Sequence, residues 1–493
     1  MKKYIVALDE GTTSTRAVLY DIKSQKIVMQ KSSPIEQIYP EISFVEENAN
    51  EIYAETLSSL VEILENADDI RSVAGIGITN QRETVIAWDK ETGKPLYNAI
   101  VWQCRRTAEF MERINEKYGE LIHRKTGLVC DAYFSASKMK WLLDNVPEIK
   151  SKNEKGELCF GTVDSFLCYK LTNGKAFVTD VTNASRTMLF NLATLTWDNE
   201  LLKIFGISEN SLPKIVMSDE KVGEFEYKGV KIPVCGIAGD QQAALVGQGC
   251  LSEGDSKITY GTGLFMLYNT GYKSIISQNG LVTTIGYGIG GRIVYAFEGS
   301  VFNAGSAVQW LRDNLGFFRK SADSESLAKE AESTDGVYVV PAFTGLGAPY
   351  WNPEARGMIT GLTRSSTKAH ITRATLEAIA YSAKDLVCVM EEESGGKLSE
   401  LKCDGGASSN DFLMDFQANL IGANVNRPEE KESTALGAAY LCAAGLGIIK
   451  PEDISSLRIC EKLFTPSGAE KDKEKYEKLY EGWKKAVKRC LYD

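Results

Sequence analysis

Two segments with the same pattern lie about half the chain apart, and this repeat limits the possible folds more than any other feature. Each segment has an apolar run, a turn rich in glycine and threonine, and a second apolar run, an order typical of a β-hairpin. The first covers residues 4–20 and the second covers residues 257–268 of the 493-residue chain. We therefore predict a duplicated architecture of two domains, residues 1–248 and 249–493.

Two strand-to-helix junctions indicate that strands and helices alternate. Residues 232–245 run from an apolar segment through Gly239 and Asp240 into a helical pattern, and residues 401–420 repeat this arrangement through Asp404. At such a junction, backbone N–H groups and the helix N-terminus face the carboxyl edge of a sheet, where open α/β folds bind their ligands. The chain is therefore predicted to be an α/β protein.

The composition argues against several classes of protein. The chain has 56 lysine and arginine residues against 66 aspartate and glutamate residues, and its net charge of -10 opposes nonspecific binding to nucleic acid. It has only two histidines, and its eleven cysteines include no Cys-x-x-Cys pair. The chain therefore has few residues from which a zinc site or a histidine-dependent catalytic triad could be built. Reduced cysteines are typical of the cytoplasm, where we expect the protein to reside.

Two further segments predict helices with different surroundings. Residues 433–449 are uncharged and rich in glycine and alanine, and they are shorter than the ~20 residues that a membrane span needs. We expect a buried helix there and no membrane insertion. Residues 471–488 place Tyr480, Trp483 and Val487 on one helical face among lysines and glutamates. This pattern predicts a packed surface helix, with a membrane-surface or partner helix as the alternative.

The chain lacks the P-loop motif, so a bound nucleotide would have to be held in another way. A kinase needs donors around the phosphates, a carboxylate for magnesium and a base for the acceptor hydroxyl. The two hairpin turns offer backbone N–H groups and hydroxyls, and two facing hairpins can hold a phosphate chain between two domains. An ordinary tight turn is the alternative for either hairpin taken alone.

Two aspartates that follow predicted strands are candidates for the chemistry. Asp240 stands where a strand ends and a helix begins, so the helix dipole favours its ionised form, which can accept a proton from a substrate hydroxyl. The same position suits an ordinary helix N-cap. Asp9 follows the first strand and is a candidate for the magnesium side, because Mg²⁺ takes one or two carboxylates besides phosphates and waters. A turn-forming aspartate is the alternative there.

A dense polar segment at residues 79–84 interrupts an apolar β run and contains the adjacent pair Arg82 and Glu83. Such a pair offers donors and acceptors together, which suits a small polyhydroxy substrate. The alternative is a β-turn with an exposed ion pair. Trp102 and Tyr133 lie in nearby segments and are candidates for the wall of such a pocket, although an aromatic side chain taken singly is more often part of the core.

Several segments together resemble the FGGY carbohydrate kinases of the actin-like ATPase superfamily, and the similarity runs from Tyr4 to Val487. Residues 133–145 look like the first signature of that family. Further segments are similar to the members of the family that phosphorylate glycerol, namely residues 77–84, 98–106, 182–190, 239–245 and 343–351. The related kinases for pentuloses and gluconate carry different residues where Arg82 and Glu83 stand, so that pair discriminates among the substrates.

The resemblance implies a fold and a function. The fold would be two ribonuclease H-like domains, the actin-like ATPase fold, with a central cleft that closes on substrate and excludes water. The function would be ATP-dependent phosphorylation of glycerol to sn-glycerol 3-phosphate in glycerol metabolism. Mg²⁺ would accompany the ATP. Relatives form dimers and tetramers, so a homodimer or homotetramer is expected.

The resemblance also implies roles for individual residues. Asp240 would be the general base, and Mg²⁺ would lie near Asp9 and Asp240. The residues that would bind the glycerol hydroxyls are Arg82, Glu83, Tyr133, Asp240 and Gln241, and those that would line its carbon face are Trp102 and Phe265. The residues that would bind the nucleotide phosphates are Thr12, Thr13, Ser14, Arg16 and Thr262, with Gly305 and Gln309 from the second domain, and the adenosine end would lie against Gly406 and Asn410.

Two departures from the family pattern have consequences. Glu10 stands where the family commonly has glutamine, so we expect a negative charge on a partly exposed side chain beside the first phosphate hairpin. Residues 221–233 are short and contain neither arginine nor histidine. Some relatives use this region for inhibition by a sugar bisphosphate and others use a phosphorylated histidine here, so neither form of regulation is expected in this protein.

Two other functions remain open at the level of the sequence. A kinase of the same fold that acts on a different polyol or ketose would need the Arg82–Glu83 pair to accept a longer chain. A non-enzymatic actin-like nucleotide switch or filament protein would share the two hairpins but would have no use for the acceptor-side Asp240. A panel of polyols and a test of polymerisation would distinguish these alternatives.

Overall fold

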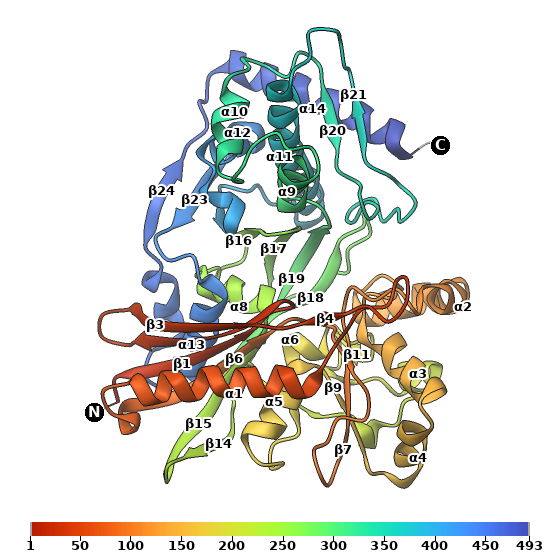
Figure 1. The fold of residues 1–493 in the computed structure, drawn as a ribbon, viewed down its shortest axis with the longest axis vertical. Helices are drawn as coiled ribbons and strands as arrows, with labels where there is room; N and C mark the ends of the chain where they lie inside the picture. The colour runs from red at the N-terminus through yellow and green to blue at the C-terminus, as the bar shows by residue number, and fades with distance from the viewer. Residues whose placement is uncertain (1, 492–493) are drawn as a thin grey trace.

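The computed structural model of the protein describes residues 2–491 and is built around two large mixed sheets (Figure 1). The six-stranded sheet has the order β14 (Lys221–Tyr227), β15 (Val230–Gly239), β6 (Val73–Asn80), β1 (Tyr4–Glu10), β2 (Ser14–Asp21) and β3 (Lys26–Pro34). The seven-stranded sheet has the order β18 (Val282–Ile289), β19 (Arg292–Val301), β17 (Leu264–Gly271), β16 (Ser256–Tyr260), β22 (Glu400–Asp404), β23 (Asn424–Pro428) and β24 (Cys460–Phe464).

The two sheets share one topology. In the first, β1, β2 and β3 are antiparallel neighbours, and β6 and β15 follow β1 in parallel. In the second, β16, β17 and β19 are antiparallel neighbours, and β22 and β23 follow β16 in parallel. The predicted hairpins are therefore β1–β2 and β16–β17, and both predictions are confirmed. The carboxyl ends of β1, β6 and β15 meet at one edge of their sheet, and those of β16 and β22 meet at one edge of theirs.

Apolar side chains on both faces make the central strands fully buried. β6 is buried along its whole length, and the apolar part of β1 is buried up to Leu8, as expected of parallel strands covered on both sides. One face of the six-stranded sheet packs against α1 (Ala49–Asn66) and α5 (Val163–Leu171). The six-stranded sheet and the helices around it form the lower body of Figure 1. Its other helices are α2 (Ala108–Thr126), α3 (Ser135–Asn145), α4 (Pro147–Lys155), α6 (Val181–Ala184) and α7 (Asn199–Phe205).

The seven-stranded sheet carries the upper body of Figure 1. Its helices are α9 (Gly305–Asp313), α10 (Asp323–Lys329), α11 (Lys368–Ser394), α12 (Asp411–Ile421) and α14 (Glu470–Leu491). α14 confirms the amphipathic helix predicted near the end of the chain. Its Trp483 is buried, stacks on Tyr381 of α11 and donates Nε1–H to Asp385. The apolar face of this helix is therefore packed against the protein itself.

The uncharged segment near residue 440 forms α13 (Ser433–Gly445), which packs against α8 (Asp240–Gly247) between the two sheets. Small residues allow this close approach. A Cβ at Gly437 would collide with the carbonyl oxygen of Ala243, and a Cβ at Gly77 of β6 would collide with that of Ala438. The expected buried helix is thus confirmed. Among the described residues, 2–491, none of the helices combines the length and the apolar character of a membrane span.

Candidate active site

The first hairpin presents a short polar turn at the carboxyl end of β1. The N–H of Gly11 donates to the carbonyl oxygen of Ser14 at 3.0 Å, and the turn leaves Thr13 exposed. Thr12 is half-buried, and its Oγ1 accepts a hydrogen bond from Nε1 of Trp102 at 2.9 Å. Arg16 lies on β2 directly opposite Asp9 and is paired with Glu432. The turn therefore offers hydroxyl groups, and one cation, Arg16, lies beside a carboxylate.

The second hairpin is held against the start of α9. The carbonyl oxygen of Thr262 accepts from the N–H groups of Ala304 and Ser306, and that of Gly261 accepts from the N–H of Gly305. A Cβ at Gly305 would collide with the Gly261 carbonyl oxygen, so this contact requires glycine. Gln309 follows one helical turn later and is exposed. The second hairpin and the start of α9 thus form one surface, which contains Thr262, Gly305 and Gln309.

A third part of the same surface lies at the end of β22. In the parallel pairing, Thr259 of β16 lies beside Asp404 of β22, so the next residues emerge close to the second hairpin. Gly406 is exposed, and a Cβ there would meet no heavy atom within 4 Å. Asn410 is the N-cap of α12, and its Oδ1 accepts from the N–H of Leu413. The predicted adenosine-side residues therefore border open space.

The acceptor-side residues converge at the carboxyl edge of the six-stranded sheet. β6 pairs in parallel with β1 on one side and with β15 on the other, so the residues after Asn80 and after Gly239 emerge together. As a result, Nε of Arg82 lies 3.2 Å from Oδ1 of Asp240, although 158 positions separate them in the numbering. Asp240 is the first residue of α8, and its side chain is 32% exposed, so its carboxylate is accessible to solvent.

Arg82 and Glu83 are buried, and the alternative of an exposed ion pair on a turn is wrong. Their side chains are 2% and 1% exposed. Glu83 adopts a left-handed backbone conformation, with φ at 60°, which is uncommon for a residue other than glycine and marks a constrained site. Buried charges need partners. Here the partners are Arg186, whose Nε donates to Oε1 of Glu83 at 2.6 Å, and Glu298, which accepts from both terminal nitrogens of Arg82.

Aromatic side chains lie beside this polar group. The rings of Trp102 and Tyr133 make an edge contact with centroids 5.6 Å apart. Burial raises the pKa of the Tyr133 hydroxyl, so it is a neutral donor at physiological pH. Phe265 is half-buried on β17 of the other sheet. Gln241 follows Asp240, and its Oε1 accepts from the buried ammonium of Lys257. Trp102 thereby contacts both the first hairpin and the acceptor pocket.

The negative charges at the carboxyl edge of the six-stranded sheet favour a bound cation. Burial raises the pKa of Asp9 to about 7, and the negative charges of Asp240 and Glu432 add to this effect while Arg16 opposes it. Carboxylate oxygens are the donors that Mg²⁺ prefers. Within residues 2–491, however, no three His, Cys, Asp or Glu side chains are grouped as a metal site. The carboxylates of Asp9 and Asp240 fit a magnesium ion, whose other ligands would come from phosphates and water.

The expectation for Glu10 is wrong. The side chain is completely buried on the α1 side of the sheet, where Oε2 accepts from the hydroxyl of Thr56 at 3.0 Å. Because successive residues of a strand point to opposite faces, Asp9 and Glu10 cannot both face the hairpin turn. Burial raises the pKa of Glu10 well above its ordinary value. Burial therefore disfavours the ionised form of Glu10, and the side chain is not exposed beside the phosphate hairpin.

The structure adds residues that the sequence analysis did not single out. Arg186 follows α6, and Glu298 is the one acidic residue in strand β19, where it follows the apolar run at residues 293–297, a signal that was available in the sequence. Lys138 is completely buried, and its ammonium donates to the carbonyl oxygens of Ala132, Tyr133 and Phe134. These side chains contact Arg82, Glu83 and the Tyr133 backbone.

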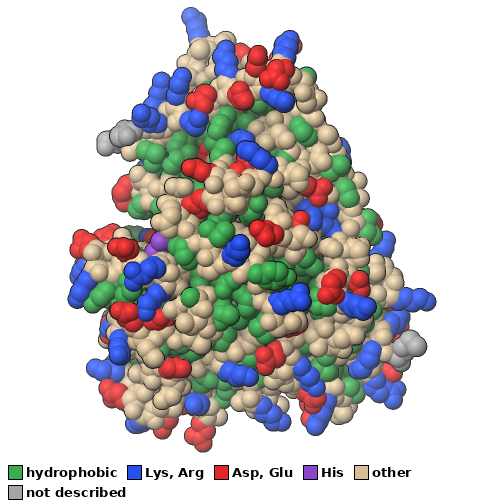
Figure 2. All heavy atoms as spheres, turned by 180° about the vertical axis from the view of Figure 1, so that it is seen from behind, with side chains coloured by type: hydrophobic (Ala, Val, Ile, Leu, Met, Phe, Trp, Pro, Cys, Tyr) green, Lys and Arg blue, Asp and Glu red, His purple; other side chains and the backbone are tan. Residues whose placement is uncertain are grey.

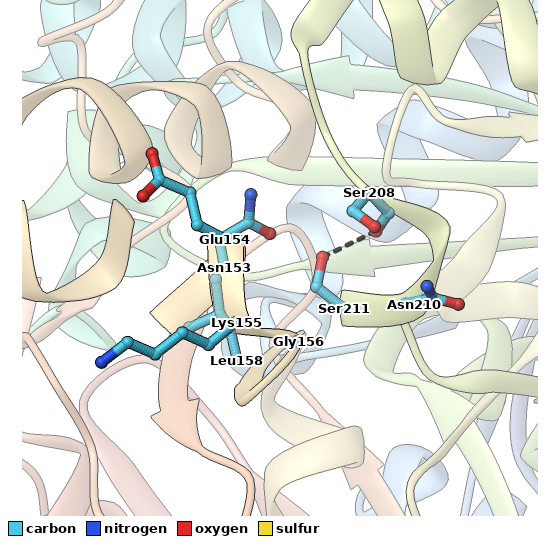
Figure 3. A pocket seen from close by; sticks show the side chains of 8 residues that line it. All are labelled: Asn153, Glu154, Lys155, Gly156, Leu158, Ser208, Asn210 and Ser211. Atoms are coloured by element: carbon cyan, nitrogen blue, oxygen red, sulfur yellow. Dashed lines mark hydrogen bonds between the residues drawn. The ribbon is translucent and has the colours of Figure 1, made fainter. Parts of the chain in front are cut away.

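A separate pocket of about 350 Å³ lies in the lower body, between the end of α4 and a short helix at Glu209–Ser211 (Figure 3). Figure 3 shows the charged ends of Glu154 and Lys155 directed away from each other, while the hydroxyl of Ser211 donates to the carbonyl oxygen of Ser208. This pocket is lined by none of the candidate site residues. The space-filling view shows a notch at one side, between the upper and lower bodies (Figure 2).

Comparison with known proteins matches both halves of the chain to one protein family. Residues 4–247 match the N-terminal domain of the FGGY family of carbohydrate kinases, and residues 256–446 match its C-terminal domain. The chain is 52% identical over 497 residues to a glycerol kinase of Geobacillus sp. (strain WCH70), covering 100% of this chain and 99% of that protein.

Two solved structures show the same architecture. A crystal structure of Plasmodium falciparum glycerol kinase with ADP matches at a TM-score of 0.92 and 38% identity, covering 99% of this chain and 98% of that chain. A xylulose kinase from Lactobacillus acidophilus matches at a TM-score of 0.89 and 24% identity, covering 100% and 99% of the two chains. The second match shows the fold alone.

Proposed function

The chain belongs to the FGGY family of carbohydrate kinases and has the α/β fold of that family, within the actin-like ATPases, and from this premise we propose that it phosphorylates glycerol. The reaction transfers the γ-phosphoryl group of ATP to a terminal hydroxyl and yields sn-glycerol 3-phosphate and ADP. Full-length similarity to glycerol kinases supports this substrate. The observation that carries the proposal is the meeting of Arg82, Glu83 and Asp240 at the cleft edge of one sheet.

The acceptor pocket suits a small polyol. Arg82 and Gln241 supply N–H donors, Glu83 and Asp240 supply carboxylate acceptors, and the Tyr133 hydroxyl serves as either, so neighbouring hydroxyls of one short chain find complementary partners. Trp102 and Phe265 line the carbon face. A substrate with fewer hydroxyls leaves these buried polar groups unpaired, which costs binding energy and gives the pocket its specificity.

The nucleotide lies across the two hairpins. Thr12, Thr13, Ser14 and Arg16 contact the phosphates from the six-stranded sheet, and Thr262 contacts them from the seven-stranded sheet. Gly305 and Gln309 extend this contact along α9, and Gly406 with Asn410 holds the adenosine end. Hydroxyls, backbone N–H groups and one guanidinium are the donors that a polyphosphate needs. Arg16 exchanges its partner Glu432 for phosphate when the nucleotide binds.

Magnesium accompanies the nucleotide. Asp9 and Asp240 are the carboxylates that would hold it, directly or through water, and the ion would neutralise negative charge on the phosphates. The raised pKa of Asp9 supports this assignment, because burial and, to a smaller extent, Asp240 and Glu432 disfavour the ionised carboxyl, and a nearby cation would stabilise it.

Asp240 is the general base. As the acceptor oxygen bonds to the γ-phosphorus and the bond to the bridging β–γ oxygen breaks, the hydroxyl proton passes to the Asp240 carboxylate and ADP leaves. Arg82, whose Nε lies 3.2 Å from Oδ1 of Asp240, keeps that carboxylate oriented. The role is typically worth 10²- to 10⁴-fold in rate.

The same proposal includes the organisation of the chain. We assign residues 1–248 to the N-terminal domain and 249–493 to the C-terminal domain, a boundary that falls between the two family matches. We also propose a homodimer or homotetramer. Light scattering after size-exclusion chromatography measures the assembly.

The test is ADP release from Mg-ATP by the purified protein, without acceptor and with glycerol, xylulose, ribulose, erythritol or gluconate at equal concentrations. Strong stimulation by glycerol alone is the expected result. Stimulation by a different compound contradicts the substrate but not the reaction class. Absence of stimulation by every compound, together with concentration-dependent polymerisation, contradicts the proposal in favour of a nucleotide switch.

A further inference from the structure

Four buried charges form a ring behind the acceptor pocket. Arg82 donates to Glu298 from Nη1 at 2.5 Å and from Nη2 at 2.9 Å. Glu298 also accepts from Nη2 of Arg186 at 3.1 Å, and Nε of Arg186 donates to Glu83 at 2.6 Å. Glu83 closes the ring at 4.0 Å from Nε of Arg82. Positive and negative charges therefore alternate around the ring.

Glu298 determines how the guanidinium of Arg82 is oriented. A bidentate pair of this kind fixes the plane of a guanidinium as well as its position. Nη1 makes a second contact with Oε1 of Gln242 at 3.1 Å, and Nε faces Asp240. Nη2 has a second N–H that none of these contacts uses. Glu298 thus directs the donors of Arg82 toward the general base and the acceptor space.

Because the ring is buried, the loss of one of its charges would leave another charge without compensation. The side chains of its four members are between 0% and 2% exposed. Burial raises the pKa of Glu298, but the charges of Arg186 and Arg82 outweigh that effect and hold it at about 2. The carboxylate therefore stays ionised at any working pH. Removing one member of a buried ion pair leaves its partner with an uncompensated charge, which is strongly unfavourable.

The ring also connects the two bodies of the protein. Arg82, Glu83 and Arg186 belong to the lower body, whereas Glu298 lies on β19 of the seven-stranded sheet, opposite Leu267 of β17 (Figure 1). β19 ends at Val301, and α9 begins at Gly305, the residue held against the second hairpin. One short segment of chain therefore carries both the partner of Arg82 and a proposed nucleotide contact.

We propose that Glu298 is a positioning residue for the phosphoryl acceptor: from the second sheet it orients Arg82 directly, and through Arg186 it orients Glu83. The proposal rests on the proposed function in that it needs an acceptor that contacts Arg82. It does not depend on which polyol is the substrate. Arg186 adds to the same effect, because its guanidinium lies over the rings of Tyr133 and Phe134, at 5.7 and 5.1 Å from their centroids.

The first test is Glu298→Gln, which keeps the shape and removes the charge. We expect the KM for the acceptor to rise at least about tenfold, since a hydrogen bond between charged groups is worth that much or more. The KM for ATP and the Kd for ADP should change less than about twofold. The matched control is Glu377→Gln on α11, a buried carboxylate that accepts from Arg373 at 2.9 Å and from Tyr381, away from the cleft. This control should leave both KM values near those of the wild type.

The second test asks whether Glu298 acts through Arg82. In an Arg82→Ala background, adding Glu298→Gln should raise the acceptor KM by clearly less than it does in the wild type, because only the route through Arg186 and Glu83 remains. Multiplication of the two single effects would overturn the proposal. So would an equal rise in the KM values for acceptor and ATP, or an acceptor KM unchanged by Glu298→Gln alone.

Failure to fold is separated from loss of position by a milder variant. Glu298→Asp keeps the charge but shortens the side chain, so it should retain the thermal transition of the wild type and still raise the acceptor KM. If the wild type responds to no acceptor, the proposed function fails. If it responds and the variants keep its acceptor KM, this inference alone fails.

Discussion

At the scale of single residues, position on a sheet decides what each carboxylate can do. Asp9 and Asp240 lie at the cleft edge with Arg82 close by, whereas Glu10, adjacent to Asp9, points into the apolar layer under α1. Three similar side chains therefore differ in burial and in partners, and burial raises the pKa of Asp9 and of Glu10. The identity of the residue type alone does not reveal which of them can accept a proton.

Asp240→Asn tests the assignment of the general base. The amide keeps the shape of the side chain but cannot take the proton, so we expect turnover to fall by about 10²- to 10⁴-fold. The Kd for glycerol, measured by calorimetry, should change little. The matched control is Asp219→Asn, a half-buried aspartate that accepts from the N–H of Gly290 outside the cleft. Turnover of Asp240→Asn within threefold of the wild type, roughly the scatter between preparations, would contradict the assignment.

Glu10→Gln tests the neutral state of Glu10. The folded protein holds this proton above the ordinary pKa of 4.5, where the unfolded chain releases it, so the free energy of unfolding falls as the pH rises. Glutamine cannot ionise. The variant should therefore match the wild type near pH 4.5 and become progressively more stable than it toward pH 8, by at most about 1.4 kcal/mol per pH unit.

Urea denaturation at several pH values measures this difference. Glu62→Gln is the control, because Glu62 is an exposed glutamate on α1 that is paired with Lys31. Its denaturation curves should follow those of the wild type at each pH. Parallel pH profiles for Glu10→Gln and the wild type would show that Glu10 is ionised in the folded protein.

At the scale of elements, the site is assembled from the ends of strands. Each sheet brings a hairpin turn and the start of a helix to its cleft edge, so the backbone supplies donors in places where side chains would not fit. Gly305 shows this for close packing, because a Cβ there would collide with the second hairpin. Gly406 shows the opposite case, since it borders open space.

Gly406→Ala tests whether the nucleotide occupies that space. A Cβ at this position meets no protein atom within 4 Å, so the thermal transition should match that of the wild type. If the adenosine end lies against Gly406, one added methyl group forces it away at a cost of about 1–3 kcal/mol, which raises the KM for ATP about fivefold or more. The KM for glycerol serves as the internal control. An unchanged KM for ATP would place the adenosine elsewhere.

At the scale of the whole molecule, two bodies with the same topology face each other across α8, α13 and the charge ring. The proposed acceptor residues lie mainly on the lower body, and the proposed nucleotide contacts come from both bodies. Transfer between the bound molecules therefore depends on the relative position of the bodies. Closure would also exclude water, which favours transfer to the alcohol over hydrolysis.

Small-angle X-ray scattering tests this closure. We expect the radius of gyration to fall when glycerol and a non-hydrolysable ATP analogue are present together, and to fall less with either ligand alone. Asp240→Asn, which keeps the shape of the pocket, should close in the same way. Identical scattering with and without both ligands would show that the bodies are already closed.

The sequence by itself determined the parts of this protein that depend on local pattern. Apolar runs followed by glycine and threonine predicted both hairpins, and the strand-to-helix junction predicted the place of Asp240, because short-range periodicity and turn chemistry specify them. The similarity to FGGY kinases is confirmed over both domains. The buried helix at residues 433–445 followed from its small, uncharged residues.

Only the tertiary structure decided which charges are buried and which residues are their partners. The ring joins residues 82, 83, 186 and 298, and the burial of Glu10 depends on α1, a helix that begins at residue 49. Such pairings arise when distant segments are brought together by sheet order and helix packing. Neither hydrophobic pattern nor turn chemistry contains that information, because both are properties of neighbouring residues, whereas the electrostatics of a site depend on everything that surrounds it in space.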